Sequence, residues 1–336
     1  MTVDADLPER LLHVLRMMTG IPELAYAQEP QVLSGGFWAE LLAFSLTGPP
    51  AGWPRELVAR LMPDPGLARK ETIVQTAVAA AGYPTPAVRA SGGPDCGLGR
   101  AFMVMDHAAG APLLSGLSGT GAIAGALRVL GQLPQVLASS MARLHVLDPH
   151  DIREQLSQAS DVPTTAGDLL DELQDTAARY GRTDLADAAT WLTGHPAPSA
   201  AEVVCHGDLH PFNLLADGDQ VTVVDWSAAL LAPRAHDVAV TTLLLAEPPL
   251  LVASPLRPVV RAVGRRLASQ FFRQYQESTN TTIGMKELHW HQALVCLRAL
   301  VEVAGWVHDG TADERRGHPW LVTGSALAAR LNSVTR

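Results

Sequence analysis

Two neighbouring stretches of the sequence decide the fold: VVCHGDLHPFNLL at residues 203–215 and VTVVDWS at residues 221–227. Apolar residues on either side of an Asp-Gly-Asp turn predict a strand–turn–strand hairpin. Asn213 lies five residues after Asp208, and Asp225 lies twelve residues after Asn213. Because the strands of a hairpin run in opposite directions, we expect Asn213 and Asp225 at the same end of it. Asp208 would lie on the loop that enters the hairpin.

These three side chains offer oxygen atoms to a common ligand. Three oxygen ligands that converge on one point suit a hard cation such as Mg²⁺, which proteins bind through one or two carboxylates together with phosphate oxygens. A further aspartate beside the ion can orient and deprotonate a hydroxyl group. Phosphoryl transfer needs this combination, because the protein positions groups and neutralises charge. The simplest alternative is that the aspartates only shape turns.

The run HGDLHPFN followed by VVDWS resembles the catalytic and metal-binding loops of the aminoglycoside phosphotransferase and choline kinase-like family. These small-molecule kinases share the protein kinase fold. The resemblance implies that Asp208 is the catalytic base and that Asn213 and Asp225 are the metal ligands. His206 resembles the histidine that braces this loop in the family. Asp237, in a segment similar to a downstream family element, would be a buried structural acid.

The elements expected around this segment change in kind along the chain. Strand patterns predominate in the first third, and helical patterns predominate beyond it, apart from the strand pair at 203–226. Expected strands lie on both sides of the Gly-Gly turn in 31–46 and at 56–62 and 101–106, and expected helices at 7–20, 67–81, 120–148 and within 236–336.

Together the pattern and the resemblance predict an α+β, bilobal protein kinase-like fold. The small strand-rich N-terminal lobe, which would bind nucleotide, covers residues 1–105. A hinge linker covers residues 106–111, and a larger, mostly helical catalytic and substrate-binding lobe covers residues 112–336. A helical insertion is expected at about 150–200.

A glycine-containing loop follows the first expected strand. Ser34, Gly35 and Gly36 resemble the family's nucleotide loop, where glycine lets backbone N–H groups approach phosphates closely. Two glycines in a hairpin are otherwise a common turn. Their position ahead of the other motifs favours the nucleotide-binding interpretation.

The apolar run from Phe102 to Gly110 resembles the family's linker between the lobes. The resemblance implies that the main-chain carbonyl of Asp106 and the N–H of Ala108 bind the adenine edge. Met105 would then flank the base. The alternative is an ordinary strand end and turn.

The kinase fold requires a cation on its third strand, paired with an acid on the next helix. The chain has only two lysines, Lys70 and Lys286, and the expected third strand carries Arg60. Arg60 is therefore the candidate for the α- and β-phosphates, with Glu71 as its partner; a surface position at the edge of the strand is the alternative for Arg60. Lys70 and Glu71 would point about 100° apart on a helix, so at most one of them would face the cleft expected between the two lobes. For Lys70 we expect a solvated helix face.

The acceptor is not decided by the sequence. Acidic residues in the insertion and in the C-terminal helices would suit an amine-bearing acceptor such as an aminoglycoside or choline, but such runs are usually solvated faces. Three tryptophans could line a stacking wall for a macrolide or a sugar, or belong to the core. These residues are Asp151, Glu154, Asp161, Asp168, Asp171, Glu172, Asp175, Glu287, Glu302, Asp309, Asp313, Glu314, Trp290, Trp306 and Trp320.

Composition narrows the classes of function. The net charge of −9 argues against a nucleic-acid binder, and the most apolar stretch, 238–256, is interrupted by Glu247 and three prolines, which argues against a membrane span. Three scattered cysteines fit a reducing compartment, and the first residues lack a secretory signal, so we expect a cytoplasmic protein. The oligomeric state stays open.

The sequence thus predicts a phosphotransferase that uses ATP, or GTP, and Mg²⁺ to phosphorylate a hydroxyl group of a small molecule. The acceptor could be an aminoglycoside or another antibiotic. One alternative is a housekeeping sugar or amino-alcohol kinase of choline-kinase type. Another is a nucleotide-binding pseudokinase that serves as a scaffold.

Overall fold

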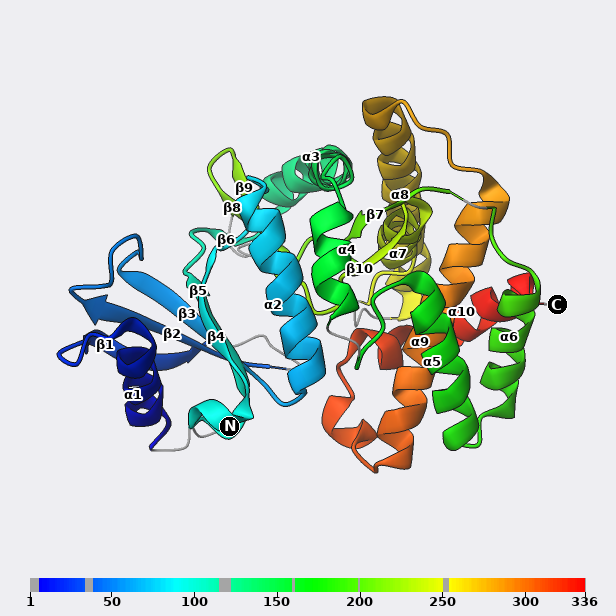
Figure 1. The fold of residues 1–336 in the computed structure, drawn as a ribbon. Helices are drawn as coiled ribbons and strands as arrows, with labels where there is room; N and C mark the ends of the chain where they lie inside the picture. The colour runs from blue at the N-terminus through cyan, green and yellow to red at the C-terminus, as the bar shows by residue number, and fades with distance from the viewer. Residues whose placement is uncertain are drawn as a thin grey trace. The chain divides into compact units, whose positions relative to one another are not determined.

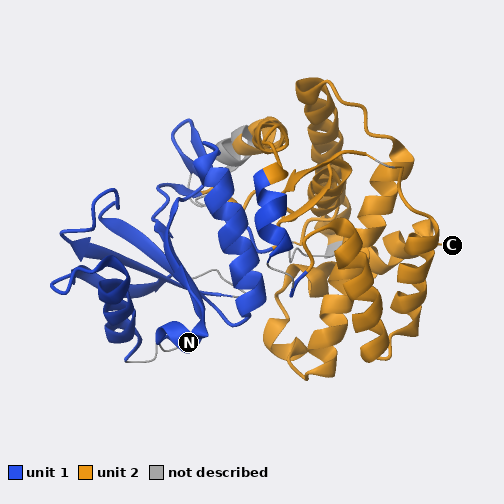
Figure 2. Ribbon diagram, viewed as in Figure 1, with its two compact units in different colours: residues 1–111, 151–162, 215–227 blue, residues 112–150, 163–214, 228–336 orange. Residues whose placement is uncertain are grey.

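The computed structural model describes residues 6–33, 39–114, 122–158, 161–198, 200–249 and 254–335 (Figure 1). The chain divides into two compact units (Figure 2). Unit 1 comprises Met1–Ala111, Asp151–Val162 and Leu215–Ser227, and unit 2 comprises Pro112–His150, Pro163–Leu214 and Ala228–Arg336.

A five-stranded antiparallel sheet forms the centre of unit 1, in the order β1-β2-β3-β5-β4. Its strands are β1 (Ala25–Leu33), β2 (Glu40–Thr47), β3 (Glu56–Met62), β4 (Val88–Gly92) and β5 (Ala101–Asp106). The helices are α1 (Leu7–Thr19), α2 (Pro65–Ala80) and α4 (His150–Ser157), the last of which lies in this unit apart from its first residue, with a short 3₁₀ turn at η1 (Pro94–Cys96). Strands β3 and β5 match the expected ranges, whereas β4 was not expected.

The alternation of side chains along β3 sorts the residues of unit 1 between its two faces. Leu57, Ala59 and Leu61 belong to the core cluster that includes α1, while Met62 packs in a second cluster with Ala68 of α2. Successive side chains of a strand point to opposite faces. Arg60 therefore shares a face with Met62, which is the face that α2 covers.

Capping residues set the limits of α2. The Asp64 carboxylate accepts a hydrogen bond from the Leu67 N–H at 2.9 Å, and Pro65 occupies the first turn. Both are favourable at a helix N-terminus. Gly82, with φ +78°, ends the segment, because this left-handed conformation strains other residues. The expected helix at 67–81 is confirmed within two residues.

The expected hairpin is present as β8 (Leu214–Asp217) and β9 (Gln220–Val223), which are neighbours in a small sheet with β6 (Ala111–Pro112). Gly218 turns the chain with φ +59°. A Cβ on Gly110 would lie 2.3 Å from the Ala216 carbonyl oxygen, so this position has room for glycine only. The hairpin sequence thus folds as its turn residues indicate.

Unit 2 is mostly helical. Its helices are α3 (Ala122–Leu144), α5 (Ala166–Arg179), α6 (Thr183–Gly194), α7 (Ala235–Ala246), α8 (Arg257–Thr279), α9 (Met285–His308) and α10 (Pro319–Val334), with short 3₁₀ turns η2 (Ser254–Leu256) and η3 (Ala312–Arg315). A two-stranded antiparallel pair joins β7 (Glu202–Cys205) to β10 (Leu230–Pro233). Helix α9 packs against α5, α6, α7 and α10, and is buried along most of its length.

The predicted α+β class, with a strand-rich N-terminal part and a mostly helical C-terminal part, is confirmed. The apolar stretch that begins at residue 238 forms most of α7, whose side chains are nearly all buried. No helix among the described residues combines the length and hydropathy that a bilayer crossing requires.

Candidate functional site

In unit 2, the loop that carries Asp208 follows directly after β7. Gly207 has φ +74°, and a Cβ there would lie 2.1 Å from the Ala228 carbonyl oxygen. The Asp237 carboxylate accepts hydrogen bonds from the N–H groups of His206, at 2.8 Å, and Gly207, at 2.7 Å. The backbone immediately before Asp208 is therefore fixed by a close approach and by a buried acid.

Asp237 is itself part of a buried polar network. His145 lies between the Asp237 carboxylate, 3.1 Å from Nε2, and the Tyr275 hydroxyl, 2.6 Å from Nδ1. Burial acts to raise the pKa of Asp237, but the hydrogen bonds and the nearby histidines outweigh it, and the pKa lies below its ordinary value. Cys205 completes a buried trio with His145 and Asp237. Both ring nitrogens of His145 and both oxygens of Asp237 already have hydrogen-bond partners, so the trio has a structural role.

The Asp208 side chain is 32% exposed, and two side chains of its own loop, His210 and Asn213, lie near it. His210 Nε2 lies 3.4 Å from its Oδ2. The Asn213 amide Nδ2 donates to the Asp208 carbonyl oxygen at 2.9 Å and lies 3.4 Å from Oδ2. With its NH₂ group turned toward Asp208, Asn213 keeps its carbonyl Oδ1 as the atom that can bind a cation. His210 was not singled out from the sequence, although it lies two residues after Asp208.

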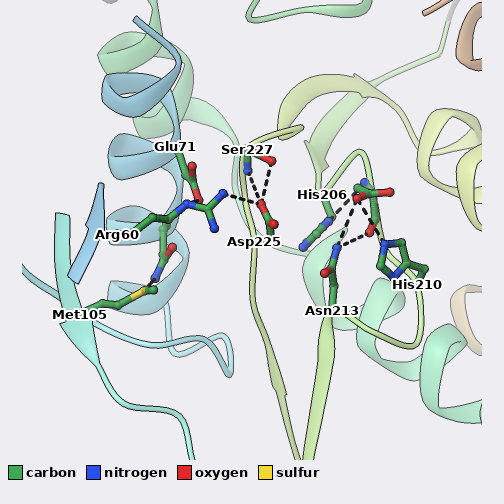
Figure 3. Close-up of polar contacts among 10 residues, drawn as sticks. Arg60, Glu71, Met105, His206, His210, Asn213, Asp225 and Ser227 are labelled. Atoms are coloured by element: carbon green, nitrogen blue, oxygen red, sulfur yellow. Dashed lines mark hydrogen bonds and ion pairs between the residues drawn. The ribbon is translucent and has the colours of Figure 1, made fainter. Parts of the chain in front are cut away.

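In unit 1, Arg60 is a buried cation between two acids (Figure 3). Its Nε lies 3.2 Å from Glu71 Oε1, and its Nη2 donates to Asp225 Oδ1 at 3.0 Å. Only 6% of Arg60 is exposed, which excludes the surface position that the sequence left open. The eleven-residue separation of Arg60 and Glu71 is sufficient because α2 begins three residues after β3 ends.

Burial raises the pKa of Glu71 to about 7; Asp225 adds to this rise, while Arg60 opposes it. Burial acts to lower the pKa of Arg60, but the two acids raise it overall. The guanidinium is thus charged, and it is oriented by both partners in a planar fork that lysine could not reproduce.

The prediction for Lys70 was wrong. This residue is 5% exposed, so it does not lie on a solvated helix face. The buried side of α2 is wide enough to include two adjacent rows, one through Lys70 and Val74 and the other through Glu71, Gln75 and Val78. Residues four apart lie on the same side of a helix, so burial of both rows encloses both charged neighbours.

The candidate linker residues lie at the end of β5. Gln75 Nε2 lies 3.3 Å from Met105 Sδ. The Asp106 carboxylate accepts two hydrogen bonds from Arg89, at 2.6 and 2.7 Å, and its N–H donates to the Ala87 carbonyl at 3.0 Å. Both the side chain and the backbone N–H of Asp106 are therefore held by protein groups. Gln75 and Arg89 carried no sequence signal.

Of the other candidates, Ser34, Gly35 and Gly36 lie outside the described residues. Asp225 follows β9 with φ +68°, and the Ser227 hydroxyl donates to its Oδ1 at 2.7 Å.

The side chains of unit 2 that could bind the phosphoryl acceptor differ in their environment. Asp171, Glu172 and Asp175 are exposed on α5, as solvated charges are. Trp306 is buried, and the centroids of its ring and of the His318 ring are 4.5 Å apart. Burial lowers the pKa of His318 to about 4, although Asp208 acts to raise it. His318 therefore lies within electrostatic reach of the candidate base, a relation that 110 residues of separation concealed in the sequence.

Residues 39–282, well over half of the chain, match the family model described as phosphotransferase enzyme family. The chain belongs to this family. A search of curated proteins gave no significant match.

Solved structures of similar fold include aminoglycoside and macrolide phosphotransferases. A provisionally assigned aminoglycoside phosphotransferase from Ralstonia eutropha JMP134 is 18% identical, with a TM-score of 0.66, and the alignment covers 97% of each chain. A thermostable mutant of aminoglycoside phosphotransferase APH(4)-Ia, in ternary complex with ADP and hygromycin B, is 17% identical, with a TM-score of 0.60, over 97% of this chain and 98% of that one. Macrolide 2'-phosphotransferase type I is 16% identical, with a TM-score of 0.56, over 98% and 99%. At these identities the likeness establishes the protein kinase-like fold.

Proposed function

We propose that this member of the phosphotransferase family transfers the γ-phosphoryl group of ATP, or GTP, to a hydroxyl group of a small molecule in a Mg²⁺-dependent reaction. The observation that carries the proposal is the buried Arg60, held between Glu71 and Asp225 in unit 1. A strand cation paired with a helix acid is the arrangement by which kinases bind the phosphates. The ADP and AMP-PNP complexes of the structurally similar APH(4)-Ia support a nucleotide as the donor.

The donor groups suit Mg²⁺. Asp225 offers a carboxylate whose side chain is 36% exposed, and Asn213 offers an amide carbonyl oxygen. Both are hard oxygen ligands of the kind that this ion prefers. In the proposal these two residues hold the ion, which neutralises phosphate charge when bound. Their joint binding of one ion stays a prediction.

On the nucleotide side, Arg60 would bind the α- and β-phosphates, with Glu71 holding its guanidinium in place. Ser34, Gly35 and Gly36 would cover the phosphates. The Asp106 carbonyl and the Ala108 N–H would bind the adenine edge beside Met105. Residues 1–105 would then form the nucleotide-binding lobe, 106–111 the hinge, and 112–336 the catalytic and acceptor-binding lobe.

Asp208 would act on the acceptor. A hydroxyl is a poor nucleophile at neutral pH, and its proton must leave as the phosphoryl group arrives. The Asp208 carboxylate is partly exposed and lies beside Asn213, so it can orient the hydroxyl and accept that proton. The backbone hydrogen bonds to Asp237 hold the preceding residues and so fix the position of Asp208.

A screen of acceptors tests the proposal. Release of nucleoside diphosphate would be measured with ATP and with GTP across aminoglycosides, macrolides, choline-like amines and sugars, with Asp208→Asn as the control. We expect one class to stimulate release in the wild type and not in Asp208→Asn. Nucleotide binding without stimulation by any class would favour the pseudokinase scaffold instead.

A further inference from the structure

A three-residue loop between α2 and β4 contacts the chain on both sides of Asp225. The Thr85 N–H donates to the Tyr83 carbonyl at 2.8 Å, so Tyr83, Pro84 and Thr85 form a tight turn about the proline. Proline fixes the backbone at the centre of the turn. The loop is therefore a stiff element, and all of it belongs to unit 1 together with Asp225.

Two hydrogen bonds join this loop to the Asp225 segment. Before Asp225, the Val223 N–H donates to the Pro84 carbonyl at 2.8 Å. After Asp225, the Trp226 indole Nε1–H donates to the Thr85 hydroxyl oxygen at 2.9 Å. The Trp226 side chain is fully buried, and the Tyr83 ring meets it edge-on with 5.7 Å between the centroids.

The segment held in this way is strained. Asp225 has φ +68°, and among the described residues only one other residue besides glycine, Asn280, has a positive φ. Asn280 ends a helix, where the left-handed conformation is common. Asp225 has no such role. Strained conformations of this kind persist where the surrounding structure over-determines them, and they concentrate at functional sites.

We propose that Thr85 is a positioning residue, which acts through Trp226 to hold Asp225 in the backbone conformation from which its carboxylate binds the nucleotide-bound Mg²⁺. This inference rests on the proposed function. Arg60 and Ser227 orient the carboxylate, whereas the loop and a hydrogen bond from the Trp226 backbone to Glu71 hold the adjoining backbone. Without the Thr85 hydroxyl, Trp226 keeps its apolar burial and its backbone bond to Glu71 but loses the hydrogen bond to its indole, so the backbone at Asp225 is held less firmly.

Thr85→Val tests the proposal because it keeps the shape of the side chain and removes the acceptor. We expect the affinity for the Mg²⁺–nucleotide complex to fall by about tenfold, while the affinity for nucleotide in EDTA changes by less than about twofold. Thr85→Ser retains a hydroxyl and should restore Mg²⁺–nucleotide binding. Both affinities would be measured by calorimetry with the full chain, with the melting temperature recorded beside them.

A double-mutant cycle with Trp226→Phe tests the proposal even if one variant folds poorly. Trp226→Phe removes the donor of the same hydrogen bond. The double variant should therefore bind the Mg²⁺–nucleotide complex no more weakly than the single variant with the lower affinity. Additive losses would overturn the proposal. So would a Thr85→Val variant that lowers both affinities equally, or that lowers neither.

Asp225→Ala separates this inference from the function on which it rests. If Asp225→Ala weakens Mg²⁺–nucleotide binding and Thr85→Val does not, only the role of Thr85 fails. If Asp225→Ala has no effect on that affinity, the assignment of Asp225 as a metal ligand fails, and the inference fails with it.

Discussion

The loop before Asp208 and the segment around Asp225 hold their acids in opposite ways. Before Asp208, the left-handed conformation falls on Gly207, which adopts it without strain, and the buried Asp237 carboxylate accepts hydrogen bonds from the backbone N–H groups. At Asp225, the residue with the left-handed conformation is the proposed metal ligand itself, and side chains from β3 and from the loop between α2 and β4 hold it and its neighbour Trp226. Under the proposed roles, the base has a fixed backbone and a partly exposed carboxylate near side chains of its own loop, whereas the metal ligand is oriented by side chains from other segments.

Loss of Asp237, whose carboxylate holds the backbone before Asp208, should have the largest effect on stability. Asp237→Ala leaves His145 and two buried N–H groups without their partner, and we expect it to cost about 3–5 kcal/mol. Denaturant unfolding would measure this cost. A variant that keeps its midpoint would show that the Asp208 loop is held by something other than this carboxylate.

A second test concerns acid stability, which we expect to be limited by unit 2. His236 and His291 are buried, their rings meet edge-on, and their nitrogens have no hydrogen-bond partner among the described residues. Burial lowers the pKa of His236 to about 4 and that of His291 to about 3; Asp237 opposes the shift at His236, and Arg298 adds to it.

The folded pKa values of this pair lie below the unfolded value of about 6.5, so the unfolded chain takes up protons first as the pH falls. Stability is then fully present above about pH 6.5 and declines between that pH and the folded values. We expect a loss of about 1–2 kcal/mol per histidine at pH 5. His291→Phe should reduce the loss, whereas the exposed His13→Gln should leave it unchanged. An unaltered pH profile in His291→Phe would contradict the assignment.

Replacement of Arg60, which contacts Asp225, should have a smaller effect. Arg60→Lys keeps the charge but cannot reach Glu71 and Asp225 together, and we expect Mg²⁺–nucleotide affinity to fall by about tenfold, or about 1.4 kcal/mol. Arg60→Ala should lose more. The measurement is calorimetric titration with and without Mg²⁺, and equal affinities in the two variants would show that the charge contributes nothing.

The smallest effect is expected on the exposed acids of α5. Asp171→Asn removes one solvated charge, and we expect a change within about 0.5 kcal/mol in stability. If the screen identifies an amine-bearing acceptor, its KM should also be unchanged. A raised KM for that acceptor would place α5 in the acceptor site.

The positions of β3 and β5 could be predicted because these two strands are short, mostly apolar and sharply bounded, whereas β1 begins six residues before the predicted strand because its first part is largely polar. Strand β3 ends where Pro63 follows it, and β5 is apolar from Ala101 to Met105. Strand β4 was missed because its sequence, VRASG, is half polar and gains its conformation from pairing with β5. Local pattern cannot register a strand that tertiary pairing creates.

The site shows the same division. The proximity of Asp208 and Asn213 followed from their spacing within one motif, and the pairing of Arg60 with Glu71 followed from the kinase fold that the sequence resembles. Contacts between distant segments could not be found. The bond between Thr85 and Trp226 joins residues 141 positions apart, and the burial of Lys70 depends on what packs against a second row of α2.

The most direct test of the proposed mechanism is the turnover of Asp208→Asn with an acceptor that the screen has identified. The substitution keeps the shape of the side chain and removes the base. We expect a fall in kcat of about 10²–10⁴-fold, with nucleotide affinity and melting temperature nearly unchanged. Turnover close to that of the wild type would contradict the roles assigned to these residues, even though the membership of the family would stand.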